Sequence, residues 1–420
     1  MSTLTYAKPH RSSRRTGTQG RTGTPRARIV SGRLALVFLS EFCALTSFYL
    51  LLSVTPMYAA AAGAGSAGAG LVTSVLLLGT VVAELAAPIL MRRYGYWAML
   101  VAGVLLLGVP ALALLAGGSL VIIVTVSVVR GFGFGLATVM TGALTAVLLP
   151  PERRGEGLGL FGVVATAPGI VALPAGVWLA GHAGMATVVG MTAATALVPL
   201  AVFPWLSGRA DRRSAEARRT GTGRPDGLLA GLRQAGQLRP FLIFAASTVA
   251  GGVVVSFLPL ATGVSGNVAA AGLLVQALTA TVSRWWAGRR GDRTGHARLL
   301  VPALVIASLG MITMIWLASP AAVIAGMFLF GTGFGIGQNA TFALMIGRMP
   351  ASGLGTASAL WNLAYDAGYG AGPALFGLLV NHTGYPAAFA LTAVLMLAAL
   401  PAARREHSAG SNRLPRAASG

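Results

Sequence analysis

Long apolar stretches alternate with short polar interruptions along almost the whole chain. A membrane-spanning helix needs about 20 mainly apolar residues, and the stretches between residues 34 and 403 meet that requirement repeatedly. We therefore predict an all-α polytopic membrane protein with twelve transmembrane helices. Their expected bounds are 34–57, 69–91, 97–117, 120–148, 157–180, 184–206, 240–262, 266–287, 299–318, 321–347, 355–380 and 385–403.

The longest polar interruption divides these helices into two groups of six. It covers residues 207–239 and is rich in Arg, Gly and Asp. We expect an N-terminal six-helix bundle over 34–206, a cytoplasmic linker over 207–239 and a C-terminal six-helix bundle over 240–403. A disordered basic tail over 1–33 and a second cytoplasmic tail over 404–420 complete the predicted organisation.

Composition supports a membrane protein over a soluble one. Hydrophobic residues make up 55% of the 420 residues and charged residues only 10%, whereas a soluble domain carries about 25% charged residues on its wetted surface. The formal net charge of +21 would suggest nucleic acid in a soluble protein. In this chain the basic tail is expected on anionic lipid instead, so membrane lipid is a predicted partner and nucleic acid is not.

The positive charges gather on one side of the predicted topology. Every Lys and Arg except Arg130 falls in the tails, the linker or the alternate short loops, with Arg284 beside them at the end of the eighth span. The opposite loops contain no Lys, Arg, Asp or Glu. Short loops rich in Lys and Arg stay in the cytoplasm, so both termini are predicted to be cytoplasmic.

Similar residues recur at an offset of 200 positions. Each recurs at an equivalent place in the predicted topology, which indicates a parallel internal duplication and two pseudo-symmetric bundles. Secondary transporters with this architecture bind substrate near the bilayer midplane, between the two halves. The matching residues are Arg93-Tyr94-Gly95 with Arg293-Thr294-Gly295, Gly133-Phe134-Gly135 with Gly333-Phe334-Gly335, and His182 and Gly184 with His382 and Gly384.

Several motifs resemble those of the major facilitator superfamily. The run from Gly288 to Gly295 is similar to its G-x-x-x-D-R-x-G signature, and Arg130 followed by Gly131, Gly133 and Gly135 resembles its Arg-plus-Gly motif of span four. Residues 169–176 are similar to the Gly/Pro motif of antiporters without its Gly-Pro dipeptide, and 361–373 resembles span eleven of bacterial arabinose-efflux-type permeases. The resemblance implies transport across a bacterial inner (cytoplasmic) membrane.

The same resemblance implies a set of gating residues at the cytoplasmic ends of spans two and eight. The first-half signature departs from the family pattern, with Pro88 where Gly is usual and Arg92 where Asp is usual. The gating role of the missing Asp is therefore in doubt in that half. The residues assigned to gating are Arg93, Gly95, Gly288, Asp292, Arg293 and Gly295.

Apart from Arg284 at the end of the eighth span, four Asp, Glu, Lys or Arg residues fall within predicted spans: Glu41, Glu84, Arg130 and Asp366. A charge at mid-bilayer costs at least ~2.5–3.5 kcal/mol on insertion scales, so each needs a partner, water or a neutral form. At ~1.5 Å per helical residue, the first three lie near one level. If Arg130 pairs with one acid, the other is left desolvated and favours its protonated form. We therefore assign all four to proton coupling.

Each of the four also has a structural alternative. Arg130 could close helices together through backbone carbonyls, and Glu41 could be hydrated by an inward-facing cavity. Glu84 could make a gating contact between spans two and eleven, and Asp366 could be a satisfied polar helix contact.

A set of polar and tyrosine side chains in the spans is a predicted lining of the substrate cavity. The same side chains could equally serve as ordinary hydrogen bonds between helices. The predicted substrate-binding residues are Tyr49, Gln276, Gln338, Asn339, Asn362, Tyr365 and Tyr369.

Other function classes find no support in the sequence. It contains no G-x-x-x-x-G-K-[ST] phosphate loop, no catalytic constellation and, with Cys43 as its only cysteine, neither a disulfide nor a thiolate metal site. We expect no cofactor, no enzymatic activity and a monomer. The leading hypothesis is a proton-coupled antiporter that exports small lipophilic or cationic molecules. The alternatives are a proton-coupled importer of a sugar-like or amino-acid-like nutrient and a transporter-like sensor.

Overall fold

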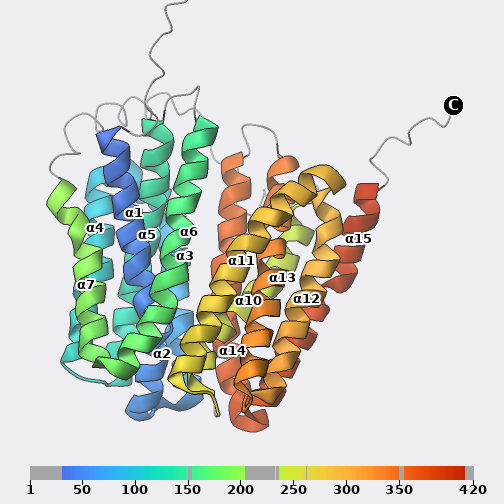
Figure 1. The fold of residues 1–420 in the computed structure, drawn as a ribbon. Coiled ribbons are helices and arrows are strands. Elements are labelled where there is room, and N and C mark those ends of the chain that lie inside the picture. The colour runs from blue at the N-terminus through green and yellow to red at the C-terminus, as the bar shows by residue number, and fades with distance from the viewer. Residues whose placement is uncertain are drawn as a thin grey trace, which may run out of the picture.

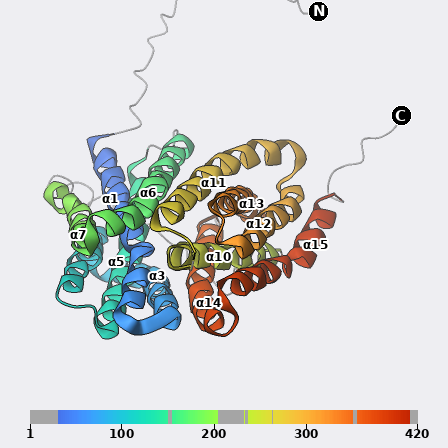
Figure 2. The same ribbon diagram turned by 60° about the horizontal axis from the view of Figure 1, so that its bottom comes forward.

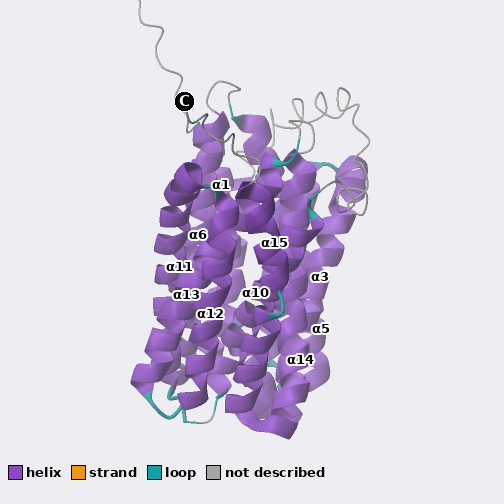
Figure 3. Ribbon diagram, turned by 90° about the vertical axis from the view of Figure 1, so that its right-hand side faces the viewer, coloured by secondary structure: helices purple, strands orange, loops and turns teal. Residues whose placement is uncertain are grey.

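The computed structural model of the chain describes residues 31–149, 154–203, 232, 236–261, 263–349 and 354–411. Within these ranges all regular structure is helical and no strand occurs (Figure 3), which confirms the expected all-α class. The basic tail expected over 1–33 lies outside the described residues as far as residue 30. The same holds for most of the linker 207–239 and for residues 412–420.

Helices from the first half of the chain lie together on one side of the molecule (Figure 1). They are α1 (Gly32–Leu52), α2 (Val54–Ala59), the π-helix η1 (Ala60–Ala64), α3 (Gly65–Tyr94), α4 (Tyr96–Gly108), the 3-10 helix η2 (Val109–Leu115), α5 (Leu120–Leu148), α6 (Arg154–His182) and α7 (Gly184–Val202).

Helices from the second half lie on the other side (Figure 1). They are α10 (Leu238–Phe257), the 3-10 helix η5 (Leu258–Leu260), α11 (Gly266–Thr294), the 3-10 helix η6 (His296–Leu299), α12 (Leu300–Thr313), the 3-10 helix η7 (Met314–Trp316), α13 (Pro320–Gly347), α14 (Leu354–Leu397) and α15 (Leu400–Ser411).

Ten helical segments among the described residues are long and apolar enough to cross a membrane, so the chain is a multi-pass membrane protein. Two of these segments are much longer than the about 20 residues that one pass requires: they cover 63 and 53 residues. The first contains non-helical backbone at Gly63, with φ 87°, and the second at Gly384, with φ 74°. Only glycine adopts such positive φ angles without steric cost.

Serine side chains mark where several of the helices begin. Ser31, Ser119, Ser265 and Ser319 each accept a hydrogen bond from the backbone N–H three residues later, at 3.3 Å. This N-cap satisfies one of the donors that the first turn of a helix leaves free.

Three expected loop or tail segments are instead helical. The external loop expected over 58–68 is filled by the end of α2, by η1 and by the start of α3. The cytoplasmic loop expected over 288–298 begins later, because α11 continues to Thr294. The tail expected from residue 404 is helical to Ser411 as part of α15. Polar residues signal the end of the membrane core, but helical hydrogen bonding does not have to stop there.

The middle of α15 is held by a buried ionic cluster that also includes residues at the start of α10 and at the end of α13. Glu406 is only 2% exposed and forms an ion pair with Arg348, while Arg239 approaches the same carboxylate at 3.8 Å. Arg348 also donates a hydrogen bond to the carbonyl of Gly236. Three segments distant in sequence therefore meet at one carboxylate.

Close helix contacts repeat with the 200-residue offset of the sequence. A Cβ added to Gly131 would collide with the carbonyl of Leu76, and one added to Gly331 would collide with the carbonyl of Gln276. Small residues let helix backbones approach in this way in membranes. The equivalent pairs are Gly135 with Thr80 and Gly335 with Ala280, and Gly133 with Leu107 and Gly333 with Ala307.

The two sides of the molecule meet along two helix pairs. Helix α3 packs against α14 and α6 against α11 (Figure 2). Along the first pair, Ser74 donates a hydrogen bond to the carbonyl of Gly370 at 2.6 Å, and Gly70 lies directly against the backbone of Pro373. These contacts bring the middle of α3 to the middle of α14.

Candidate functional site

Two acidic side chains face each other between α3 and α14. Glu84 is half-buried on α3 and Asp366 is 8% exposed on α14, and their carboxyl groups form a side-chain hydrogen bond. A carboxylate only accepts hydrogen bonds, so one member of such a pair must carry a proton. Of the α3–α14 contacts described above, this one lies nearest to the ends of the helices at Tyr94 and Leu354.

Three tyrosines predicted to line the cavity come together beside this carboxyl pair. The side chain of Tyr365 lies close enough to interact with Tyr49 of α1 and with Tyr369 one turn along α14. The rings of Tyr365 and Tyr369 are stacked, with centroids 5.1 Å apart. Asp366 interacts electrostatically with Tyr49 and Tyr365. The tyrosine cluster therefore joins the two sides of the molecule at the level of the acids.

Arg130 does not pair with an acid. Its Nε donates to the carbonyl of Leu107 and one terminal nitrogen donates to the carbonyl of Ser47, both at 3.0 Å. The side chain is 2% exposed and thereby joins α5 to α4 and α1. The pairing of Arg130 with an acid that the sequence analysis considered does not occur among the described residues, and the contacts of Arg130 match the alternative in which it holds helices together through carbonyls.

Glu41 lies in a different part of the N-terminal side from Arg130. Its carboxylate accepts a hydrogen bond from the hydroxyl of Thr141, which lies on α5 about 16 Å from Arg130 at ~1.5 Å per residue. Glu41 is buried, with 4% of its surface exposed. The single level expected for Glu41, Glu84 and Arg130 is thus not what the structure shows.

Arg284 is a site residue that the sequence reasoning missed. It is half-buried on α11, its guanidinium lies 5.9 Å from the centroid of the Trp361 ring, and it interacts electrostatically with Tyr49 and Tyr365. The sequence could have identified Arg284, because the 200-residue offset places it at the position equivalent to Glu84. It was counted instead as a flanking charge at the end of a span.

The four amides predicted to line the cavity do not join the tyrosine cluster. Among the described residues, none of their side chains hydrogen-bonds to a tyrosine of that cluster. Asn339 lies against Gly288 between α11 and α13, and its Oδ1 is buried without a hydrogen-bond partner within the described ranges. Gln276 and Gln338 are half-buried and Asn362 is exposed.

The predicted gating residues occupy helix ends rather than loops. Arg93 lies in the last turn of α3 and Arg293 in the last turn of α11. Gly95 and Gly295 end these helices with φ 86° and 89°, so their backbone geometry repeats along with their sequence. Asp292 contacts His296 one turn later, with 3.3 Å between Oδ1 and Nε2.

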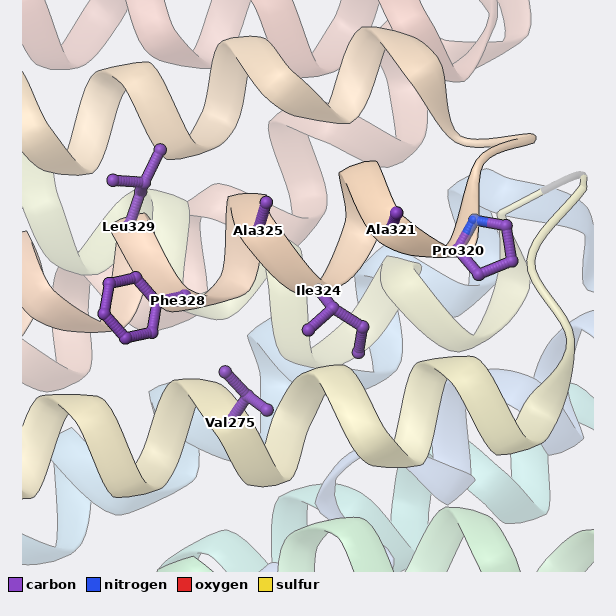
Figure 4. A pocket seen from close by; sticks show the side chains of 7 residues that line it. All are labelled: Val275, Pro320, Ala321, Ile324, Ala325, Phe328 and Leu329. Carbon is purple, nitrogen blue, oxygen red and sulfur yellow. The ribbon is translucent and has the colours of Figure 1, made fainter.

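A surface groove lies elsewhere, on the outer face of α11 and α13 (Figure 4). Its lining is entirely apolar and contains none of the residues discussed above. The lining residues are Val275, Pro320, Ala321, Ile324, Ala325, Phe328 and Leu329. A groove of this composition between two membrane helices offers no group that could fix a polar ligand.

Comparison with known proteins identifies the family. The model of the Major Facilitator Superfamily matches residues 37–373, which is most of the chain. The chain belongs to the Major Facilitator Superfamily. Members of this superfamily are transporters rather than enzymes and bind small-molecule substrates, so the predicted family and the predicted absence of enzymatic activity are both confirmed. A search of curated protein sequences gives no match.

Solved structures with the same fold include transporters of several substrates. A peptide transporter POT in complex with alafosfalin has a TM-score of 0.69 at 16% identity, covering 92% of this chain and 96% of its own. A D-xylose–proton symporter has a TM-score of 0.67 at 16% identity, with coverage of 88% and 98%. The nucleoside transporter NupG has a TM-score of 0.66 at 13% identity, with coverage of 89% and 98%. At these identities the likeness shows the superfamily fold.

Proposed function

We propose that this superfamily member is a proton-coupled secondary transporter that exports small lipophilic molecules by alternating access. The observation that carries the proposal is the hydrogen-bonded carboxyl pair of Glu84 and Asp366 between α3 and α14. The pair needs at least one proton to form. Proton binding and the contact between the two sides of the molecule are therefore one event.

Loss of that proton supplies the driving force for opening. Two carboxylates about 4 Å apart repel by about 4 kcal/mol at an effective dielectric constant of about 20. The groups around the pair do not cancel this repulsion: Tyr49 and Tyr365 are neutral hydroxyls, and Arg284 interacts with these tyrosines. Deprotonation thus separates α3 from α14, and reprotonation brings them together.

The overall organisation follows from the same proposal. We take each of the 63- and 53-residue segments as two passes, so that the ten candidate segments make twelve helices. The repeated glycine contacts support two pseudo-symmetric six-helix bundles, with boundaries near residues 206 and 240. The concentration of Lys and Arg supports cytoplasmic termini in a bacterial cytoplasmic membrane. We propose that the unit acts as a monomer.

Of the remaining sequence-predicted coupling residues, Glu41 is proposed as a second proton-binding group and Arg130 as a positioning residue. Glu41 is buried with only a hydroxyl as its hydrogen-bond partner. Arg130 holds α5 against α1 and α4, which fixes the helix that carries Thr141. The helix-end residues Arg93, Asp292 and Arg293 are proposed to control the cytoplasmic ends of α3 and α11.

The carboxyl pair serves an importer equally well, and one observation favours that second candidate. A D-xylose–proton symporter is among the structures with this fold. Direction depends on whether substrate and proton bind together or exclude each other. If substrate entering between α3 and α14 breaks the hydrogen bond of the carboxyl pair, substrate and proton exclude each other, as an exporter requires.

Transport into membrane vesicles tests the proposal. A panel of lipophilic compounds is offered to everted vesicles with and without an imposed pH gradient, using wild type, Glu84→Gln and Asp366→Asn. Gradient-driven accumulation that both variants lose is the expected result. Accumulation that both variants retain would refute the role of the pair. Gradient-driven uptake only into right-side-out vesicles would establish the importer instead.

A further inference from the structure

We propose that Arg284 and the aromatic side chains around it form an anion-accepting subsite, so that the transported molecule carries a carboxylate on a flat apolar body. The inference rests on the proposed transport function and narrows its substrate class. It disfavours lipophilic cations as substrates, which the sequence analysis had allowed. The argument begins with the unmatched charge of Arg284.

Arg284 lies on α11, ten residues before the end of the helix at Thr294. Its position is about 27 Å along the helix from Gly266, at ~1.5 Å per residue, and its side chain is half-buried. A cation within a span is costly unless it has a partner. Over the described ranges of the chain, no side chain or carbonyl forms an ion pair or a hydrogen bond with Arg284.

Other arginines of the structure show how such charges are normally satisfied. Arg130 is bonded to two carbonyls, and Arg348 and Arg239 share the carboxylate of Glu406. Arg289, one helical turn and a half beyond Arg284, is exposed and stacks on Trp285 at 3.7 Å. Arg284 alone among these combines partial burial with an unmatched charge.

The acids nearby are not available to Arg284 in this conformation. Asp366 and Glu84 are bonded to each other, and the groups that Arg284 meets are the hydroxyls of Tyr49 and Tyr365 and the face of Trp361. Hydroxyls donate to an anion as readily as they accept from a cation. Arg284 and the two tyrosines therefore lie close enough to interact, and all three carry donors of the kind that binds a planar carboxylate.

Aromatic rings extend from this place into the C-terminal side. Trp361 and Tyr365 have ring centroids 6.0 Å apart, and Phe244 stacks on Trp361 at 4.4 Å. Trp361 is fixed by its Nε1, which donates to the hydroxyl of Thr341 at 3.2 Å. A rigid aromatic surface beside a cation accommodates the ring of an aromatic acid, because offset stacked and edge contacts between rings are favourable.

The internal repeat places the proposed proton-binding group and the proposed anion-binding group at equivalent positions of the two halves. Glu84 and Arg284 occupy equivalent positions on α3 and α11, the helices that contact α14 and α6 respectively. One position holds an acid with an acidic partner, and the other holds a base without an acidic partner among the described residues. Positions at which the two halves of a duplicated chain differ in charge are expected at functional sites. The proton and the substrate anion would thus bind at the two equivalent helices.

Three probes that share one ring system test the subsite. We would measure the affinity of the purified full-length protein in nanodiscs for 1-naphthoate, naphthalene-1-carboxamide and 1-naphthylmethylammonium. Charge-assisted hydrogen bonds from a buried arginine predict a preference for naphthoate over the carboxamide of about tenfold or more. Arg284→Gln should remove that preference and leave carboxamide affinity unchanged. Arg284→Lys should keep only part of it, because Lys lacks the planar fork.

Arg289→Gln is the matched control, since it removes an exposed arginine from the same helix and should leave the preference intact. An equal affinity for naphthoate and carboxamide in wild type, or a preference that survives in Arg284→Gln, would overturn the inference. Should Arg284→Gln not fold, Arg284→Lys with an undiminished preference would overturn it as well. Gradient-driven transport of the carboxamide tests the proposed function separately, because its failure would leave the binding preference standing.

Discussion

Deprotonation of the Glu84–Asp366 pair should separate the Tyr94 end of α3 from the Thr294 end of α11, because α11 lies on the same side of the molecule as α14. The chain has a single cysteine, Cys43, so Cys43→Ala gives a background without thiols. Spin labels at the exposed positions Tyr94 and Arg290, introduced as Tyr94→Cys and Arg290→Cys, report the separation. We expect the distance distribution to shift to longer values between low and high pH, because two ionised carboxylates repel each other.

The size of the effect follows from the geometry of the pair. With both groups ionised, repulsion of about 4 kcal/mol corresponds to a shift of roughly a thousandfold in the conformational equilibrium. In Glu84→Gln the amide donates to the Asp366 carboxylate without a titrating proton. The label distances in this variant should then stay short at both low and high pH, as expected for the state in which α3 and α14 are in contact. Asp366→Asn should behave in the same way.

The label distances are measured by double electron–electron resonance spectroscopy of the protein in nanodiscs. The variant Glu41→Gln is the control. Glu41 is a buried carboxyl on the N-terminal side whose partner is Thr141, so its removal should leave the pH response of the label distance in place. The reasoning would be refuted if the double variant Glu84→Gln/Asp366→Asn retained the full response. A response lost in Glu41→Gln but kept in the other variants would move the switch to Glu41.

Three further predictions concern stability, measured by thermal unfolding in detergent. Arg130→Ala should destabilise the fold by about 3 kcal/mol or more, because two buried charge-assisted hydrogen bonds are lost; an unchanged melting temperature would contradict the staple. Gly131→Ala should cost about 1–3 kcal/mol through collision with a neighbouring backbone, whereas the matched Gly142→Ala, which meets no atom within 4 Å, should stay within about 0.5 kcal/mol. Glu406→Gln should loosen α15 and cost about 1–3 kcal/mol, and increased proteolysis after Arg404 or Arg405 would report it independently.

The sequence was sufficient for the all-α class, for the bounds of individual helices, for the repeated residues and for the family. A membrane helix satisfies its backbone hydrogen bonds within one segment, so apolar length alone predicts where it lies, and α5 has the predicted bounds of 120–148. The 200-residue offset was visible in paired glycines such as Gly95 and Gly295, and the structure gives both the same positive φ. Signature residues from Gly288 to Gly295 indicated the superfamily that the family comparison then established.

The tertiary structure alone decided which partner each intramembrane charge takes. Counting residues along the helices predicted one level for Glu41, Glu84 and Arg130, which the structure does not show, and such counting does not determine the direction in which each side chain points. Helix rotation and packing gave Arg130 two carbonyls, Glu41 a threonine and Glu84 an acid 282 positions away in the chain. Such partners depend on which faces of distant helices meet, and that information is spread over all the packing contacts of the protein.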